Sequence, residues 1–521
     1  MSDPREERIK ELRDLKALAL KGGGDEKIEK QHNKGKMVAR ERLDYLLDKG
    51  SFVEFGLLLG HHKKAFGEGI ISGHGTIDGR KVCVYSQDAT VLGGSVGGLT
   101  GFKMYRTIEL ALEMGVPLIG LHDSPGARVA RLDDGPAGNF PAGEKNQGSV
   151  FFPNTQASGV IPQISGMFGS CAGMSVYSPA MHDFIFMVDK QSHMFITGPL
   201  MVKTVMGEEI SLEELGGAAV HCRISGTADG RYANDQACLD AIKDLLRYLP
   251  ANHEEQPPAI KSQDSPERMN DDLMNIVPAL SNKPYDMRKV ILSILDDGRF
   301  FEIKREFAGE MIVGFGRLNG KTTGVIANQP LVLAGSLTVD ASDKQARFIR
   351  FCDCFNIPIV LLVDTPAYMP GRAQEHAGII RHGAKVLYAL CEATVPRISV
   401  LLRKVYGGAT LGMGIVPGMG TDMVYMWPTA EIAVLGAETS VMLYFGKEIA
   451  EAADPEAFRK QKIKEFSDIY ANPIPNASSN WSVTDIIEPR ETRSVLIKSL
   501  AFLESKKRPI RTPKRHGNIS L

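Results

Sequence analysis

The chain has 521 residues, 43% of them hydrophobic, with 61 basic and 62 acidic side chains. This length exceeds what one hydrophobic core usually supports, so two large domains are expected. The even charge balance excludes a global field that would recruit nucleic acid or a membrane surface. No apolar run reaches the roughly 18 residues of a membrane helix, and the charged start lacks a signal-peptide core. Seven cysteines without a CxxC pair are typical of reduced thiols. A cytoplasmic protein without membrane insertion is predicted.

Residues 1–45 are predicted to be a charged helical segment that is broken by three consecutive glycines. After this segment, short apolar runs rich in β-branched residues alternate with helical patterns. The predicted strands lie at 81–87, 116–122 and 160–168, and then at 322–329, 357–364 and 397–402. Strands that are apolar on both faces and alternate with helices indicate an α/β protein with a mostly parallel, covered sheet. In such sheets, ligands bind at the carboxyl ends of the strands.

The two halves of the chain repeat each other. DGRKVCVYSQDATVLGGS (78–95) matches NGKTTGVIANQPLVLAGS (319–336), and VPLIGLHDSPGAR matches IPIVLLVDTPAYM at the same offset. Further along, the offset changes and Gly173 aligns with Gly408. A register held over so many residues indicates duplication of one fold. We therefore predict an N-terminal domain at 1–255, a polar linker at 256–275 and a C-terminal domain at 276–521.

One familiar catalytic motif is present in the first repeat. Residues 93–97, GGSVG, fit the G-x-S-x-G nucleophile elbow of α/β-hydrolases. The matching loop, LAGSL, keeps the serine and lacks both flanking glycines, so a duplicated structural loop is the better interpretation. A hydrolase with Ser95 as nucleophile stays open as an alternative. No Walker phosphate loop and no H-E-x-x-H zinc motif occurs.

A pair of glycine loops follows the third predicted strand of each half: CAGM (171–174) and YGGA (406–409). A backbone amide without a large side chain beside it can approach a ligand oxygen closely. Two such amides that point to one place form an oxyanion hole. Tight packing of a helix on a strand also favours glycine, but its occurrence in both halves favours function. Arg403 and Lys404, just upstream, more plausibly close off the strand end than take part in chemistry.

Long motifs around these loops resemble one known family. They include KQHNKGKMVARERLDYLLDKGSFVE, SGVIPQIS, CAGMSVYSPA and HMFITGP in the first half, and VDASDKQARFIRFCDCFNIPIV, RKVYGGA and MWPTAEIAVLGAE in the second. The sequence resembles carboxyltransferase (β) subunits of biotin-dependent acyl-CoA carboxylases, of the propionyl-CoA carboxylase and methylmalonyl-CoA transcarboxylase or decarboxylase type. The resemblance implies two crotonase-like domains, each a ββα superhelix, which agrees with the duplication.

The resemblance also implies roles for individual residues. The amides of Gly173 and Met174 would hold the thioester oxygen of an acyl-CoA, and those of Gly408 and Ala409 the ureido oxygen of biotin. The carboxyl group would pass from carboxybiotin to the α-carbon of a propionyl-CoA-like substrate through a thioester enolate. The predicted substrate-binding residues are Gly126, Ala127, Arg128, Tyr177 and Leu411, and Gly407 joins the predicted cofactor-binding residues. No metal is expected. Leu411 aligns with a position that carries Asp in many propionyl-CoA carboxylases and helps to select the acyl chain.

The expected partners follow from the same resemblance. The chain has no M-K-M biotinylation site and no ATP-grasp domain, so biotin is expected on a biotin carboxylase or carboxyl carrier subunit, and the chain itself in a homo-hexamer. The reverse half-reaction, in a decarboxylase or transcarboxylase, stays open, as do a crotonase-like hydratase and a non-catalytic paralogue. Pro125, Met174 and Ala367 stand where the family usually has glycine, which leaves the acyl group undetermined.

Overall fold

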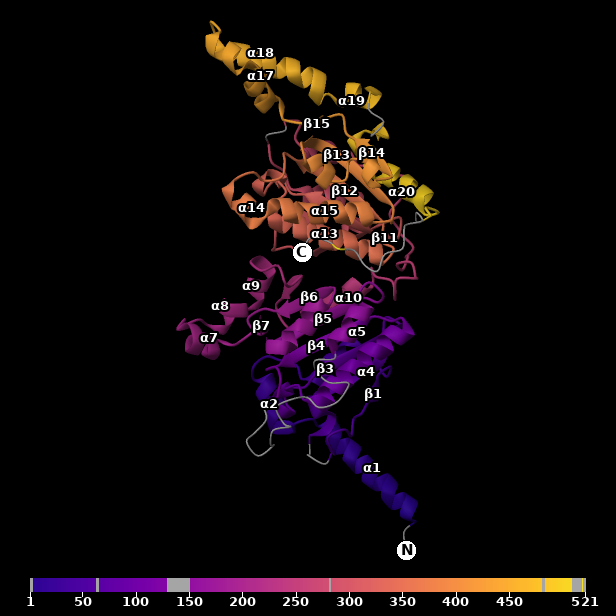
Figure 1. The fold of residues 1–521 in the computed structure, drawn as a ribbon. Helices are drawn as coiled ribbons and strands as arrows, with labels where there is room; N and C mark the ends of the chain where they lie inside the picture. Colours follow the sequence, from indigo (N-terminus) through magenta and orange to yellow (C-terminus); the bar gives the residue numbers. More distant parts are fainter. Residues whose placement is uncertain are drawn as a thin grey trace. The chain divides into compact units, whose positions relative to one another are not determined.

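The computed structural model describes residues 3–61, 65–128, 150–280, 283–479, 483–507 and 518. The chain divides into two compact units, residues 1–255 and 256–521 (Figure 1). Within the described ranges, no helix is both long and apolar enough to cross a bilayer.

The first unit contains an eight-stranded mixed sheet in the order β1-β2-β3-β4-β5-β6-β8, with β7 paired to β5. The first three strands are antiparallel, and β3, β4, β5, β6 and β8 pair in parallel. The strand bounds are β1 (Val53–Phe55), β2 (Ile70–Ile77), β3 (Arg80–Gln87), β4 (Leu118–Ser124), β5 (Gln163–Ala172), β6 (Phe184–Val188), β7 (His193–Phe195) and β8 (Gly230–Tyr232).

Helices cover both faces of this sheet. Cys83 and Tyr85 of β3 pack in one cluster with Met104 and Ile108 of helix α4. On the other face, a side chain at Gly166 of β5 would contact α10. The helices are α1 (Pro4–Leu20), α2 (Asp25–His32), α3 (Ala39–Leu46), α4 (Gly98–Met114), α5 (Phe151–Ala157), α6 (Tyr177–Met181), α7 (Pro199–Met206), α8 (Leu212–Gly216), α9 (Ala218–Arg223) and α10 (Asp235–Leu246).

The second unit repeats this architecture, with the sheet order β16-β14-β13-β12-β11-β10-β9 and β15 paired to β13. The predicted α/β class with duplicated domains is therefore confirmed. The strands are β9 (Phe300–Ile303), β10 (Met311–Leu318), β11 (Lys321–Asn328), β12 (Ile359–Thr365), β13 (Arg397–Tyr406), β14 (Met423–Met426), β15 (Glu431–Ala433) and β16 (Asp485–Ile486). The helices are α11 (Leu273–Ile276), α12 (Met287–Ile294), α13 (Val339–Cys354), α14 (Arg372–Ala377), α15 (Ile379–Glu392), α16 (Ala409–Gly412), α17 (Ala437–Glu451), α18 (Pro455–Phe466), α19 (Pro473–Ser479) and α20 (Thr492–Leu503).

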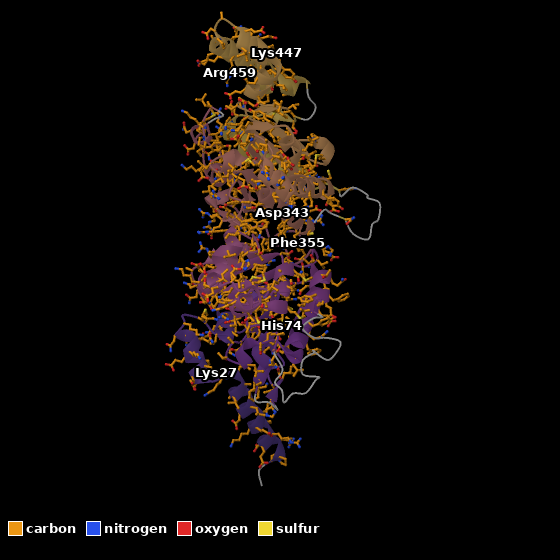
Figure 2. All side chains as sticks on the ribbon, turned by 60° about the vertical axis from the view of Figure 1, so that its left-hand side comes forward. Lys27, His74, Asp343, Phe355, Lys447 and Arg459 are labelled. Atoms are coloured by element: carbon orange, nitrogen blue, oxygen red, sulfur yellow. The ribbon has the colours of Figure 1, made fainter. Side chains whose placement is uncertain are left out.

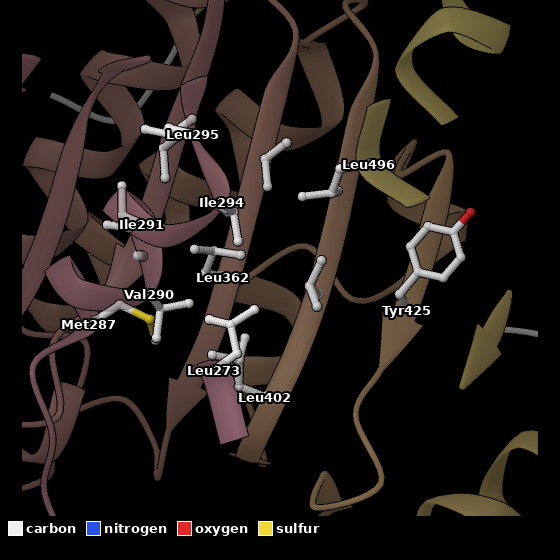
Figure 3. Packing of buried hydrophobic residues seen from close by; sticks show 14 of the residues in the cluster. Leu273, Met287, Val290, Ile291, Ile294, Leu295, Leu362, Leu402, Tyr425 and Leu496 are labelled. Atoms are coloured by element: carbon white, nitrogen blue, oxygen red, sulfur yellow. The ribbon is translucent and has the colours of Figure 1, made fainter. Parts of the chain in front are cut away.

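The core of the second unit lies between its sheet and helices α12 and α20. Ile291 and Ile294 from α12 and Leu496 from α20 pack with Leu362 of β12 and Leu402 of β13 (Figure 3). All five are fully buried. Hydrophobic burial on this scale, about 25 cal/mol per Å² of apolar surface, is the dominant stabilising contribution to such a unit. By contrast, α18 buries no residue, and Lys447 of α17 and Arg459 of α18 are exposed (Figure 2).

Residues 256–275, which we expected to form a linker, are bonded to the second unit. The Ile260 amide donates to the carbonyl of Gly320. The buried guanidinium of Arg493 on α20 donates to the Ser265 carbonyl and lies 3.5 Å from Asp264. These contacts fix the segment to elements more than fifty residues away in sequence. The segment therefore has a defined structure despite its polar composition.

Candidate functional site

The two glycine loops begin where strands β5 and β13 end. In the first unit, the last pair between β5 and β7 is Ala172 with Phe195. In the second, the last pair between β13 and β15 is Tyr406 with Ala433. The strand pairings therefore make Gly173 equivalent to Gly407.

This equivalence corrects the alignment made from sequence by one residue. Aligning the glycines put Gly173 on Gly408, whereas the backbone places Met174 on Gly408. The alignment of letters was wrong because the number of residues between paired strands, and not glycine identity, fixes the register. Gly173 and Gly407 share a left-handed backbone, with φ values of 62° and 54°. A residue with a side chain is strained in this conformation, which accounts for glycine at both positions.

Two successive amides of the second loop differ in their hydrogen bonding. The Gly407 amide donates to the carbonyl of Ala433 at 3.0 Å, so it is not available to a ligand. For the next amide, that of Gly408, no acceptor occurs within the described part of the chain. Ala409 opens α16, and Gly173 and Met174 open a 3-10 turn. The first amides of a helical turn have no acceptor inside it, so they can serve a ligand oxygen.

The ring of Tyr368 packs against the glycine loop of the second unit. A Cβ atom added at Gly408 would lie 3.5 Å from the Cδ2 atom of Tyr368, in ordinary contact. A Cβ atom at Gly412 would lie 2.6 Å from the Tyr368 hydroxyl, so a side chain there would displace the tyrosine ring. Burial raises the pKa of the Tyr368 phenol to about 12, so it stays protonated. Sequence reasoning missed this residue, since its contacts come from three separate segments.

Arg403 and Lys404 lie upstream of the same loop, and both face Asp364 at the end of β12. The Arg403 Nε atom is 2.8 Å from Asp364 Oδ2, and Lys404 Nζ is 3.7 Å from Oδ1. Arg403 also donates to the carbonyls of Leu280 and Lys283. Burial lowers the pKa of Lys404, and the Asp364 carboxylate opposes this shift. Both cations therefore lie against a buried carboxylate at the strand end, which is the structural role expected for them.

In the first unit, the loop after β4 passes close to the end of β5. Gly126 has a φ of 108°, and a Cβ atom there would lie 2.6 Å from the carbonyl oxygen of Ala172, next to Gly173. The structure therefore brings the predicted substrate-binding segment 126–128 beside the predicted thioester loop. The Arg128 side chain forms an ion pair with the buried Glu68, with a Nη1–Oε2 distance of 2.8 Å. Glu68 was not predicted, because its segment, FGEG, carries no recognisable pattern.

The remaining predicted residues are partly exposed. The Tyr177 side chain is 48% exposed and packs edge-on against Phe151, and Leu411 of α16 is 39% exposed. Both side chains can contact a ligand. Among the described residues, no cluster of histidine, cysteine and carboxylate side chains could hold a metal ion.

Ser95 lies in a structural turn. Its hydroxyl donates to the carbonyl of Leu92 at 2.7 Å and accepts from Arg128 Nε. Leu92 and its counterpart in the second unit, Leu333, have the same left-handed backbone, with φ of 51° and 46°. The turn therefore recurs with its strain in both units, as a duplicated structural loop should. These contacts give no support to a nucleophile at Ser95.

Comparison with known proteins places this geometry in a family. Residues 30–519 match the carboxyl transferase domain family. The carboxyltransferase subunit of propionyl-CoA carboxylase from Haloferax mediterranei is 49% identical over 524 residues, covering 99% of each chain. The chain belongs to the carboxyl transferase family. This carboxyltransferase is also 46% identical, over 99% of both chains, to the methylmalonyl-CoA decarboxylase subunit alpha from Veillonella parvula.

A solved structure agrees with the fold of this carboxyltransferase. The crystal structure of transcarboxylase 12S, a hexamer with methylmalonyl-CoA and methylmalonic acid bound, matches with a TM-score of 0.93 and 43% identity, over 100% of this chain and 99% of that one. The two units are thus crotonase-like domains, and the chain is a carboxyltransferase subunit of the biotin-dependent acyl-CoA carboxylase type. The resemblance inferred from the sequence motifs is confirmed.

Proposed function

We propose that this carboxyltransferase moves a carboxyl group from biotin, carried on a partner subunit, to the α-carbon of a short-chain acyl-CoA such as propionyl-CoA. The observation that carries this proposal is the pair of glycine turns at equivalent strand ends. Each turn presents backbone amides that have no acceptor in their own helical turn. The two relatives described above, a propionyl-CoA carboxylase subunit and a methylmalonyl-CoA decarboxylase subunit, support the choice of acyl group.

In the first unit, we assign the amides of Gly173 and Met174 to the thioester oxygen. When the α-proton leaves, negative charge develops on this oxygen, and amides already aimed at it stabilise the charge. One such donor typically lowers the barrier by about 3–4 kcal/mol. The neighbouring loop 126–128, held by the ion pair of Arg128 with Glu68, would position the CoA ester beside these amides.

In the second unit, the residues fit a biotin ureido group. The Gly408 amide has no acceptor among the described residues, Gly408 is exposed, and the Tyr368 ring lies 3.5 Å from the position that a Cβ atom would take there. Carboxylated biotin, when bound, supplies the activated carboxyl group. The amides of Gly408 and Ala409 would bind and orient its ureido oxygen. Once the carboxyl group has left as CO₂, the ureido group held there would accept the α-proton, so the reaction would require no side-chain base from this chain.

The test uses the half-reaction in reverse. The purified protein is incubated with methylmalonyl-CoA and free biotin, and propionyl-CoA is quantified by chromatography. Biotin-dependent formation of propionyl-CoA is expected. Malonyl-CoA is tested beside methylmalonyl-CoA because the two thioesters differ only in the acyl group. Absence of turnover with both would therefore refute carboxyl transfer and not merely the choice of acyl group.

The physiological direction is a second question, because the half-reaction is reversible. The similarity to a decarboxylase subunit specifically favours the reverse direction as a second candidate. Isolation of the native complex distinguishes the two. A co-purifying biotin carboxylase supports carboxylation, and a co-purifying membrane subunit supports decarboxylation. We also propose a hexamer, as in transcarboxylase 12S, which light scattering would measure.

A further inference from the structure

The two units differ in one exchange of side-chain size beside their glycine turns. In the first unit, Val96 forms a bridge with Ala127, and in the second Leu337 forms the same bridge with Tyr368. The flanking hydrogen bonds also correspond. The Val96 amide donates to the carbonyl of Gly126 at 2.9 Å, and the Leu337 amide donates to the carbonyl of Ala367 at 3.0 Å. Ala127 therefore occupies the place of Tyr368.

The large and small residues have changed sides between the units. In the second unit, the large residue is Tyr368 on the loop after β12, and the facing residue, Gly408, has no side chain. In the first unit, the loop after β4 carries the small, exposed Ala127, and the turn after β5 carries Met174 at the position of Gly408. A Cβ atom at Gly408 would point to the Tyr368 ring at 3.5 Å. The equivalent Cβ atom of Met174 therefore points to the space beside Ala127.

Met174 does not fill this space as a fixed core residue. Its side chain is 42% exposed, and an unbranched thioether adapts readily to the shape of a neighbouring group. Its backbone amide opens the 3-10 turn and is one of the two assigned to the thioester oxygen. A side chain on the residue that binds the carbonyl oxygen lies next to the acyl chain attached to that carbonyl.

We propose that Met174 is a specificity-determining residue whose side chain, opposite Ala127, forms one wall of the acyl subsite and limits the size of the acyl group. This inference rests on the proposed function and adds the residue that sets its substrate class. The wall is apolar, so it selects among short unsubstituted acyl chains by length.

The test is a comparison of kcat/KM for acetyl-, propionyl- and butyryl-CoA, with carboxybiotin as the carboxyl donor, between the wild type and Met174→Ala. Truncation should raise the butyryl-to-propionyl ratio by about tenfold or more, the usual effect of one methylene in a hydrophobic pocket. Ala127→Leu, which narrows the same space from the other side, should lower that ratio. Met174→Leu keeps a side chain of similar volume, so its butyryl-to-propionyl ratio should stay within about threefold of the wild-type ratio. Met442→Ala on α17, a similarly exposed methionine, serves as the matched control.

The outcomes separate the two proposals. No carboxyl transfer by the wild type to any acyl-CoA would refute the proposed function. An active Met174→Ala protein with an unchanged ratio would refute the role of Met174 alone. Loss of all three activities in a folded Met174→Ala protein would also overturn it, because the side chain would then serve the reaction and not the choice of acyl group. If that variant does not fold, an unchanged ratio in Ala127→Leu overturns it.

Discussion

Arg403 and Asp364 form a buried ion pair at the carboxyl end of the second sheet, with 2.8 Å between Nε and Oδ2 and side chains 1% and 0% exposed. In the first unit, the equivalent carboxylate is Asp123, and its cations come from the N-terminal segment. Lys36 lies 2.7 Å and Arg42 3.2 Å from Asp123. The strand position equivalent to Arg403 is Gly169, where even a Cβ atom would clash with Asp123. Each unit thus neutralises the same carboxylate from a different element.

Replacing Arg403 with methionine should destabilise the second unit severely. The change removes the guanidinium 2.8 Å from the fully buried Asp364 and leaves only the more distant Lys404 to offset its charge; breaking a buried pair typically costs about 3–5 kcal/mol. Urea-induced unfolding would measure the loss. Lys404→Met is the matched control, because Lys404 lies farther from the carboxylate, at 3.7 Å, and is partly exposed. Equal losses in the two variants would contradict the assigned role of Arg403.

A β-branched side chain at Gly408 should abolish carboxyl transfer and leave the fold intact. A Cβ atom fits at 3.5 Å from Tyr368, but the γ-methyl groups of valine would crowd the ring or cover the free amide. We expect Gly408→Val to lower the rate of the methylmalonyl-CoA half-reaction by at least 100-fold, as for loss of one oxyanion donor, about 10²–10³.

Gly408→Ala is the graded control for this experiment, because its single methyl group makes only an ordinary contact. It should retain far more activity than the valine variant, and circular dichroism should be native for both. Wild-type activity in Gly408→Val would show that this amide does not contact the transferred group.

The sequence predicted the sheet architecture well, and it placed both glycine loops at strand ends, where the structure has them. The strand expected at 397–402 lies within Arg397–Tyr406, and the one at 357–364 overlaps Ile359–Thr365. Periodicity finds these strands because they are apolar on both faces. It could not find the register at Gly173, which depends on pairing with Phe195. Nor could it find Tyr368 or Glu68, whose roles arise from contacts between distant segments.

The buried Lys344 allows a prediction about the stability of the second unit. Its Nζ atom lies within hydrogen-bond distance of four carbonyl oxygens, those of Lys304, Phe307, Ala308 and Met311, at 2.6–3.3 Å. Burial lowers the pKa of Lys344 to about 7. Lys344→Met should destabilise the second unit by about 3 kcal/mol, because buried acceptors left unsatisfied cost about 1–3 kcal/mol or more. Chemical denaturation would measure this loss. An unchanged midpoint would contradict the view that Lys344 stabilises the second unit by binding these carbonyl oxygens. Its counterpart in the first unit, Lys103, donates to the Ile70 carbonyl at 2.6 Å and should behave alike.

Two buried histidines of the first unit should make its stability fall in mild acid. Ser165 contacts His182 Nδ1 at 2.8 Å and His122 Nε2 at 3.3 Å, and Asn154 contacts the other nitrogen of His182. Burial lowers the pKa of His122 to about 3 and that of His182 to about 4. Well above pH 6.5 both residues are neutral in the folded and unfolded states. Below it the unfolded chain binds protons that the folded chain does not, so stability falls as the pH drops from about 6.5 to 4, by up to about 1.4 kcal/mol per pH unit for each histidine.

Unfolding free energies measured at pH 7, 6, 5 and 4 would test this slope. His182→Gln removes one of the two groups, so its curve should be flatter than that of the wild type by up to about 1.4 kcal/mol per pH unit. The control is His74→Gln, since His74 is exposed on β2 (Figure 2). This control separates the buried histidines from the carboxylates, which protonate in all three proteins. A His182→Gln slope equal to that of the wild type would mean that His182 binds its proton as readily in the folded protein as in the unfolded chain, which would contradict the prediction.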